Sequence, residues 1–208
     1  MNFIKKKTKT GIALLMALTM MLSCSTISVN AASDVTPRLG SGQLEYGVSR
    51  VNYYITDSIL NHSIGSTLVT LINNAANSWV YTGYGYNPLY MYRTYDLYSS
   101  NFDIYGSTQI IESYNRVNVS YWRGTSANPI WVDPTTTNWE YAEMTLFVDM
   151  HSGDQTKLQR SIAHGIGHAL GLDDNYNNPN SVMCDFYHVC NVYKPGKADH
   201  DGLNAIYN

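Results

Sequence analysis

The sequence has few charged residues and few long apolar runs, and each shortage excludes a class of protein. Asp, Glu, Lys and Arg make up only 14% of the 208 residues, whereas 18 Tyr and 4 Trp supply apolar area. A disordered chain is therefore not expected. The 13 basic residues are outnumbered by 16 acidic ones, which argues against a nucleic-acid partner and its need for a basic face. Residues 11–22 are apolar, but this run is shorter than the roughly 20 residues of a membrane-spanning helix, and no other segment approaches one.

Acidic residues are missing from the first 33 positions, where residues 5–9 carry four lysines. This basic start, the apolar run at 11–22 and the small residues up to Ala32 give the three-part layout of a secretory signal. We therefore expect residues 1–32 to be a signal peptide and the mature chain to be secreted. The alternative is a lipoprotein cleavage box at residues 21–24, which would leave the protein anchored through lipid on Cys24.

The remainder shows no internal repeat and no low-complexity linker. We expect residues 33–50 to be a loosely held N-terminal segment, and residues 51–208 to fold as one domain, a monomer. Cleavage near Ala32 would remove one of the three cysteines. Cys184 and Cys190 remain, six residues apart, and in an oxidising compartment a small disulfide loop is expected.

Apolar periodicity predicts the secondary structure of this domain. Strands are expected at 51–56, 89–95, 108–112, 117–122 and 141–150, and helices at 66–80, at 154–170 and from Asp199 onward. Asp154 is a suitable N-cap and Gly171 a suitable stop for the second helix. Strands first, with helices between and after them, indicate an α+β fold with one twisted sheet carrying helices.

Two histidines on the second helix carry the functional signal. His164 and His168 are four residues apart, so their side chains leave the same face of the helix and can reach one metal ion. Gly171 lets the backbone leave the helix with positive φ, and three residues later Asp174 can return to the metal. Zinc accepts two imidazole nitrogens and a carboxylate oxygen, with the fourth position open. The alternative is an ordinary polar helix face.

The run from His164 to Asp174 resembles the zinc signature of the metzincin metallopeptidases, His-Glu-x-x-His-x-x-Gly-x-x-His/Asp, and most resembles the matrixin-like branch. Residues 180–183 resemble that family's Met-turn, with Met183 beneath the zinc, and residues 195–207 resemble its closing helix. The resemblance implies a metzincin-like catalytic domain with a mostly parallel sheet and an antiparallel edge strand. It also implies Zn²⁺ as cofactor and hydrolysis of peptide bonds in a peptide or protein substrate. Structural Ca²⁺ is an open question.

By the same resemblance, residues 141–150 would be the edge strand along which an extended peptide substrate lies. A plain edge strand without a ligand is an equally good interpretation of that segment.

The departure from the family pattern is at Gly165, where the family has its general-base Glu. In the family, that Glu takes a proton from the attacking water and later delivers one to the leaving amine, but it is not a ligand. We therefore expect zinc binding to persist and catalysis to fall by roughly 10²–10⁴-fold. Asp173 and Glu143 are candidates for a substitute base. Two other functions stay open: a pseudoprotease that binds peptides without cutting them, and a domain whose zinc is purely structural.

Overall fold

The computed structural model describes residues 35–109, 117–125, 128–148, 154–184 and 190–208. The expected signal peptide, with Cys24, lies outside the described residues. All described residues belong to one compact unit. The six strands are β1 (Val51–Ile55), β2 (Met91–Thr94), β3 (Phe102–Ser107), β4 (Val117–Thr125), β5 (Asn128–Trp131) and β6 (Tyr141–Phe147). The helices are α2 (Asp57–Leu60), α3 (Gly65–Val80), the 3₁₀ helix η1 (Leu97–Ser99), α4 (Gln155–Ala169) and α5 (Lys197–Tyr207).

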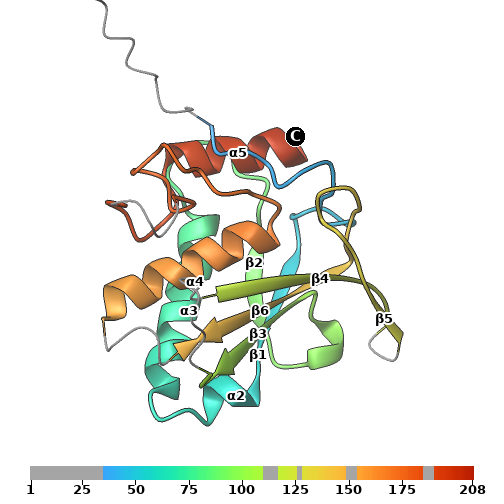
Figure 1. Cartoon of the computed structure of the whole chain (residues 1–208), viewed down its shortest axis with the longest axis vertical. Coiled ribbons are helices and arrows are strands. Elements are labelled where there is room, and N and C mark those ends of the chain that lie inside the picture. Colours follow the sequence, from blue (N-terminus) through green and yellow to red (C-terminus); the bar gives the residue numbers. More distant parts are fainter. Residues whose placement is uncertain (1–34, 110–116, 126–127, 149–153, 185–189) are drawn as a thin grey trace, which may run out of the picture. The chain divides into compact units, whose positions relative to one another are not determined.

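The strands form one sheet in the order β2-β1-β3-β6-β4-β5 (Figure 1). The neighbours β2, β1, β3 and β6 run parallel, whereas β4 is antiparallel to both β6 and β5. The predicted α+β class with a mostly parallel sheet is confirmed. The predicted edge position of residues 141–150 is wrong, because β6 lies between β3 and β4.

β4 is paired with β5 along only part of its outer edge. Its partner β5 pairs only with residues 122–125, by hydrogen bonds in the register Trp122↔Trp131 to Thr125↔Asn128. Among the described residues, no strand pairs with the outer edge of residues 117–120. Within the described part of the chain, the backbone groups on this edge therefore have no strand partner.

The sequence did not predict β3 or β5. Of the strand expected at 108–112, residues 108–109 are not in a strand and the other three lie outside the described residues. β3 alternates poorly, since Phe102, Asp103 and Ile104 are all buried. A strand that is buried on both faces in this way gives no period-2 signal.

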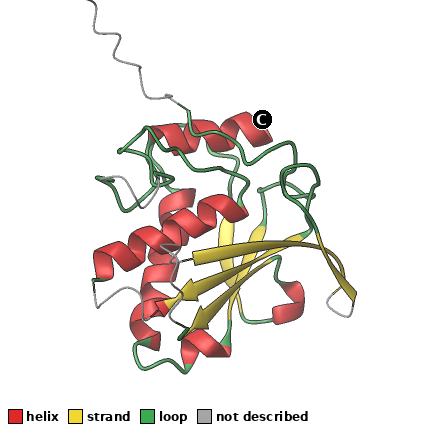
Figure 2. Cartoon of the chain, in the orientation of Figure 1, coloured by secondary structure: helices red, strands yellow, loops and turns green. Residues whose placement is uncertain are grey.

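Helices α3 and α4 pack together on one face of the sheet, and Figure 2 shows them as neighbouring red ribbons beside the yellow strands. The helix predicted at 66–80 from apolar periodicity is confirmed, and the buried residues of α3 form one stripe: Gly65, Leu68, Leu71, Ile72, Ala75, Ala76 and Trp79. Trp79 fixes the helix pair further by donating from Nε1 to the carbonyl of Ala163 at 2.8 Å. Each fully buried Leu or Ile side chain stabilises the fold by about 1.5–3 kcal/mol relative to an exposed one. No described helix is long and apolar enough to span a membrane.

The segment before β1 is not loosely held, contrary to the expectation for residues 33–50. Leu44 is buried in the core and pairs with Trp139 in an isolated β-bridge. The amide of Leu39 donates to the carbonyl of Gly171, and the amide of Asp173 donates to the carbonyl of Pro37. This N-terminal segment therefore ties down the loop that follows α4.

Candidate metal centre

Helix α4 carries both histidines and is fixed at each end. Its N-cap is Asp154, as predicted, whose carboxylate accepts from two amides of the first turn at 3.0 Å each. At the other end Gly171 has φ +96°, a conformation that L side chains rarely adopt. Its amide donates to His168 O, and the next amide, of Leu172, donates to Gly167 O. These bonds close the last turn and direct the chain back toward the helix.

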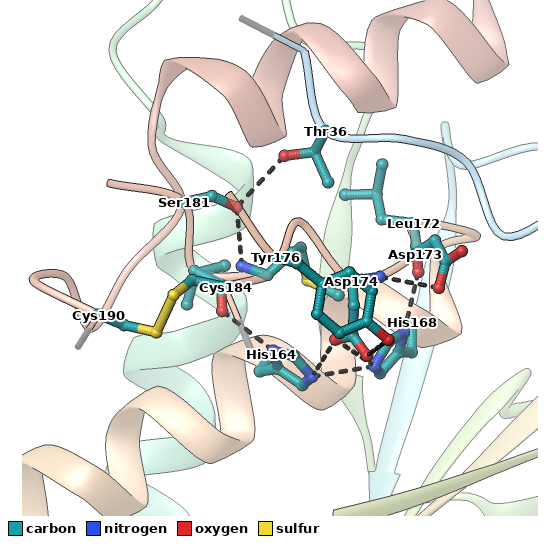
Figure 3. A network of polar contacts seen from close by, with 12 residues as sticks. Thr36, His164, His168, Leu172, Asp173, Asp174, Tyr176, Ser181, Cys184 and Cys190 are labelled. Carbon is teal, nitrogen blue, oxygen red and sulfur yellow. Dashed lines mark hydrogen bonds and ion pairs between the residues drawn. A yellow bond between two sulfur atoms is a disulfide. The ribbon is translucent and has the colours of Figure 1, made fainter. Parts of the chain in front are cut away.

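The two imidazoles are held in one tautomer by backbone carbonyls. His164 Nδ1 lies 3.0 Å from Val182 O, and His168 Nδ1 lies 2.9 Å from Leu172 O. Because a carbonyl oxygen can only accept, each Nδ1 carries the proton and each Nε2 keeps a lone pair. Figure 3 shows both rings directing Nε2 toward Asp174.

Three potential ligand atoms converge at this point. The Nε2 atoms are 2.9 Å apart, and Asp174 Oδ1 lies 3.3 Å from Nε2 of His164 and 3.7 Å from Nε2 of His168. Asp174 Oδ1 is buried and accepts no hydrogen bond from the described residues. A tetrahedral zinc ion with bonds of about 2.0–2.1 Å separates its ligands by roughly 3.3 Å. The donor set and its spacing therefore fit zinc, as the sequence predicted.

Burial favours the metal-binding protonation state. Burial, and next the neighbouring His164, lower the pKa of His168 to about 4, against the opposing effects of Asp174 and of the hydrogen bond to Leu172 O. Burial alone would raise the pKa of Asp174, but the two imidazoles and the Tyr176 hydroxyl bring it below its ordinary value. At neutral pH the site thus offers a neutral imidazole from His168 and a carboxylate from Asp174.

Met183 packs directly beneath α4. It is fully buried, and a Cβ at Gly167 would overlap its sulfur and lie 2.9 Å from the indole of Trp79. The absence of a side chain at Gly167 is therefore what allows Met183 to approach the helix between the two histidines. This close approach was not foreseen from the sequence.

A buried carboxylate positions the turn that contains Met183. Asp199 is 0% exposed. It accepts from Thr36 Oγ1 at 2.7 Å, from the Ser181 hydroxyl, and from the amides of Val182 and Gly196 at 2.9 and 2.8 Å. Because the carbonyl of Val182 accepts from His164 while its amide donates to Asp199, Asp199 is connected to the candidate metal site through a single residue. The sequence placed Asp199 at the start of the last helix and missed this role, since α5 begins two residues earlier.

The position of the missing base is filled by packing. A Cβ at Gly165 would overlap the sulfur of Met144 and lie 3.3 Å from Cγ2 of Val117. Met144 is fully buried on β6, and Val117 begins β4. A larger residue at position 165 would therefore require the Met144 side chain to move. This close packing favours glycine at position 165, which the sequence did not reveal.

The predicted disulfide is confirmed between Cys184 and Cys190. It closes a loop directly after the Met183 turn. Arg160 of α4 donates to the carbonyl of Cys184 at 3.0 Å and lies 2.7 Å from the sulfur of Cys190. The cross-link and this arginine together hold both cysteines beside the helix that carries the histidines.

Of the two candidates for a substitute base, Glu143 is not placed for that role. The Glu143 side chain lines a pocket with Asp103 on the face of the sheet that lies away from α4, so its assignment near the metal is wrong. Asp173 accepts the amide of Asp174 through Oδ1 at 2.8 Å and so helps to hold the loop. Tyr121, which the sequence did not single out, donates to the carbonyl of His168 at 3.1 Å and joins β4 to the end of α4.

Comparisons with known proteins connect this site to one family. The Matrixin family model (Peptidase_M10) matches residues 112–208, a span that contains β4, α4, α5 and the three potential ligands. The matrixin family is zinc-dependent, and the match supports a metzincin-like, metallopeptidase-like protein. A search of curated proteins gave no match. Among solved structures, the chain is similar to one described as the GM1 bound form of the ECX AB5 holotoxin. The identity is 14%, the TM-score is 0.43, and the match covers 76% of this chain and 80% of that chain.

Proposed function

We propose that this protein is a secreted, matrixin-like zinc protein in which His164, His168 and Asp174 bind one Zn²⁺. The observation that carries the proposal is the convergence of two Nε2 lone pairs on a buried Asp174 oxygen that accepts no hydrogen bond from the described residues. Three protein ligands leave a fourth position, as in catalytic rather than structural zinc sites. When bound, zinc supplies a Lewis acid that polarises a carbonyl and lowers the pKa of a water molecule to about 7.

We infer that the substrate or ligand is an extended peptide. The outer edge of β4 at residues 117–120 has free backbone groups among the described residues, and β4 packs against α4. Tyr121 keeps this strand beside the C-terminal turn of the helix through its bond to His168 O. An extended peptide added to this edge would run past the metal centre and make backbone hydrogen bonds irrespective of its sequence.

We propose further that cleavage is weak, because no side chain supplies the general base at position 165. The contact of Gly165 with Met144 supports an adapted site rather than a simple loss, since Glu cannot be restored without moving that methionine. This contact favours a second candidate function, a pseudoprotease that holds peptides without cutting them.

The test compares peptidase activity of four zinc-loaded proteins: wild type, Met144→Ala, Gly165→Glu and the double variant. The double variant gives the new carboxylate room, and Met144→Ala alone is its matched control. We expect the double variant to exceed wild type by roughly 10²–10⁴-fold, the usual contribution of a positioned acid–base group. Wild-type turnover equal to that of a folded, zinc-loaded double variant would end the proposal of weak cleavage.

A peptide-binding measurement then distinguishes the two remaining functions, a pseudoprotease and a domain with purely structural zinc. A pseudoprotease binds peptide at the β4 edge and releases it unchanged. A purely structural zinc site predicts that chelation unfolds the protein and that no peptide competes with solvent at the metal.

Export is tested separately by sequencing the N-terminus of protein from the culture medium, where we expect a start near Ser33. A membrane-bound form that begins at a lipidated Cys24 is the contrary result.

A further inference from the structure

Apart from the candidate metal centre, the molecule has a second site, a pocket on the face of the sheet that is turned away from α3 and α4. We call it the second pocket. Its volume is about 480 Å³, within the usual range for small-molecule sites. Along β6, Ala142 and Met144 are buried beneath the helices, whereas Tyr141 and Glu143 line this pocket. η1 and the β4–β5 hairpin complete the lining. Because Met144 meets α4 on the opposite face, the pocket is separate from the metal centre.

Two carboxyl groups lie side by side on its floor. Asp103 of β3 and Glu143 of β6 are register partners on neighbouring parallel strands, so their Cα atoms are about 4.8 Å apart. Asp103 is only 7% exposed. Its Oδ1 accepts a hydrogen bond from the Ser100 hydroxyl, and no described residue donates to its Oδ2. The pocket therefore contains a nine-tenths-buried carboxylate with one oxygen still available as an acceptor.

No cation of the described chain compensates these two acids. Burial raises the pKa of Asp103, and burial together with Asp103 raises the pKa of Glu143. The groups that lower these two pKa values are the Ser100 hydroxyl and the Trp122 indole, and both are neutral. Two adjacent, partly desolvated carboxylates are costly unless a positive charge joins them.

The walls are aromatic. Tyr98 of η1, Tyr105 of β3 and Tyr141 of β6 line the same pocket as the two acids. Burial and the neighbouring carboxyls raise the pKa of Tyr105 to about 12, so its ring stays neutral with a hydroxyl that can accept an N–H donor. Neutral tyrosine faces attract organic cations through the ring quadrupole.

We propose that this pocket binds an organic cation of side-chain size, the ammonium of a lysine or the guanidinium of an arginine, between Asp103 and Glu143 and against the tyrosine rings. The head group donates to the two carboxylates, and the apolar stem lies along the rings. A calcium ion is less suited, because it needs six to eight oxygen ligands and gains nothing from aromatic walls. The proposal does not depend on the zinc site, and both can be tested on one metal-free sample.

The experiment is an NMR titration of the metal-free full chain with n-butylammonium and ethylguanidinium, followed through the tyrosine ring resonances. We expect dissociation constants on the order of 1 mM, typical of so small a ligand. A capped Gly-Lys-Gly peptide, compared with capped Gly-Gln-Gly, distinguishes a peptide side chain from a free amine as the source. Tighter binding of the lysine peptide than of n-butylammonium identifies a peptide ligand, and weaker binding identifies a free cation.

Variants separate the contributions. Glu143→Gln and Asp103→Asn should each weaken n-butylammonium binding at least about tenfold, because each removes a charge-assisted hydrogen bond. Tyr98→Leu should weaken it about two- to fivefold. Asp201→Asn removes the same charge on α5, where the acid pairs with Lys197, and should leave binding unchanged. The half-buried Glu143 provides the test if Asp103→Asn does not fold. Equal binding of 1-pentanol, unchanged affinity in Glu143→Gln, or displacement of the amine by equimolar Ca²⁺ overturns the proposal.

Discussion

At the scale of single residues, the metal site depends on which nitrogen of each imidazole carries a proton. The carbonyls of Val182 and Leu172 accept from the two Nδ1 atoms and thereby assign both Nε2 lone pairs to the site. Such partners of ligating histidines usually contribute 10–100-fold in metal affinity. Here they belong to the backbone, so no side-chain substitution removes them directly.

Asp174 is the third potential zinc ligand, and substitution can test whether its negative charge is needed for zinc binding. We predict that Asp174→Asn lowers zinc affinity by more than 100-fold, beyond the usual effect of an outer partner, because a neutral amide replaces the only anionic ligand. Competition against a zinc-binding dye measures the change. Asp173→Asn is the control, since it alters the same charge one residue away and its side-chain oxygen can still accept the amide of Asp174. An equal loss in both variants would mean that the general charge of the loop, rather than ligation, binds the metal.

The sequence predicted this cluster of three potential ligands because helical spacing is local. His164, His168 and Asp174 lie within eleven positions, and their geometry follows from one helix turn and one glycine. The packing reason for Gly165 could not be predicted in that way. It rests on Met144, from a strand twenty-one residues earlier, whose side-chain direction depends on its place within the sheet. The same dependence explains why Glu143 was wrongly assigned near the metal.

At the scale of elements, the end of α4 sets the approach of Asp174. We predict that Gly171→Ala lowers the free energy of unfolding by about 1–2 kcal/mol, because a Cβ is strained at φ +96° while its neighbours lie no closer than 3.4 Å. It should also weaken zinc binding, since the loop to Asp174 leaves from this residue. Urea denaturation and the dye competition measure the two effects.

The matched control is Gly83→Ala. Gly83 has φ +82° and nothing within 4 Å of its Cβ position, so the strain is similar but remote from the metal ligands in sequence and contacts. It should lower stability without changing zinc affinity. If both variants bind zinc as tightly as wild type, the turn is not what positions Asp174.

The three longer helices were easier to predict than the order of the strands, whereas the short helices α2 and η1 were not predicted. The apolar stripe of α3 and the cap of α4 are properties of contiguous residues, and both were predicted within one or two positions. The position of β6 inside the sheet depends on pairing with β3, which starts about forty residues earlier. No local sequence pattern predicts such long-range strand pairing, particularly because β3 itself does not alternate between buried and exposed residues.

At the scale of the whole molecule, Asp199 connects three distant segments. Its carboxylate accepts from Thr36 near the start of the described chain, from the Ser181–Val182 turn and from Gly196 before α5. We predict that Asp199→Ala lowers the free energy of unfolding by at least about 3 kcal/mol, because several buried donors lose their acceptor at once. Urea denaturation measures the loss. Asp201→Asn on the same helix should cost less than about 1 kcal/mol, as expected for a surface ion pair. Similar values for the two variants would contradict a central role for Asp199.

The acids of the second pocket should make the stability of the whole chain depend on pH. The pKa values of Asp103 and Glu143 are raised on folding, first by burial. Between the ordinary values of about 4 and the raised ones, the folded state binds more protons than the unfolded state. The free energy of unfolding should therefore rise as the pH falls through the raised pKa values and level off below the ordinary ones.

Asp103→Asn isolates this effect, because its amide oxygen can still accept from Ser100 while the charge beside Glu143 is gone. We predict that metal-free Asp103→Asn melts about 2–4 °C above wild type at pH 7, the shift that 1 kcal/mol gives in a chain of this size. The difference should shrink toward zero as the pH approaches 4, where wild type is protonated as well. Tyr105 and Tyr141 line the same pocket, but their pKa values are raised above 10, so they do not titrate in this range. Thermal melts at pH 4, 5, 6 and 7 measure the difference, and a variant that melts below wild type at pH 7 would mean that the carboxylate is already compensated in the folded protein.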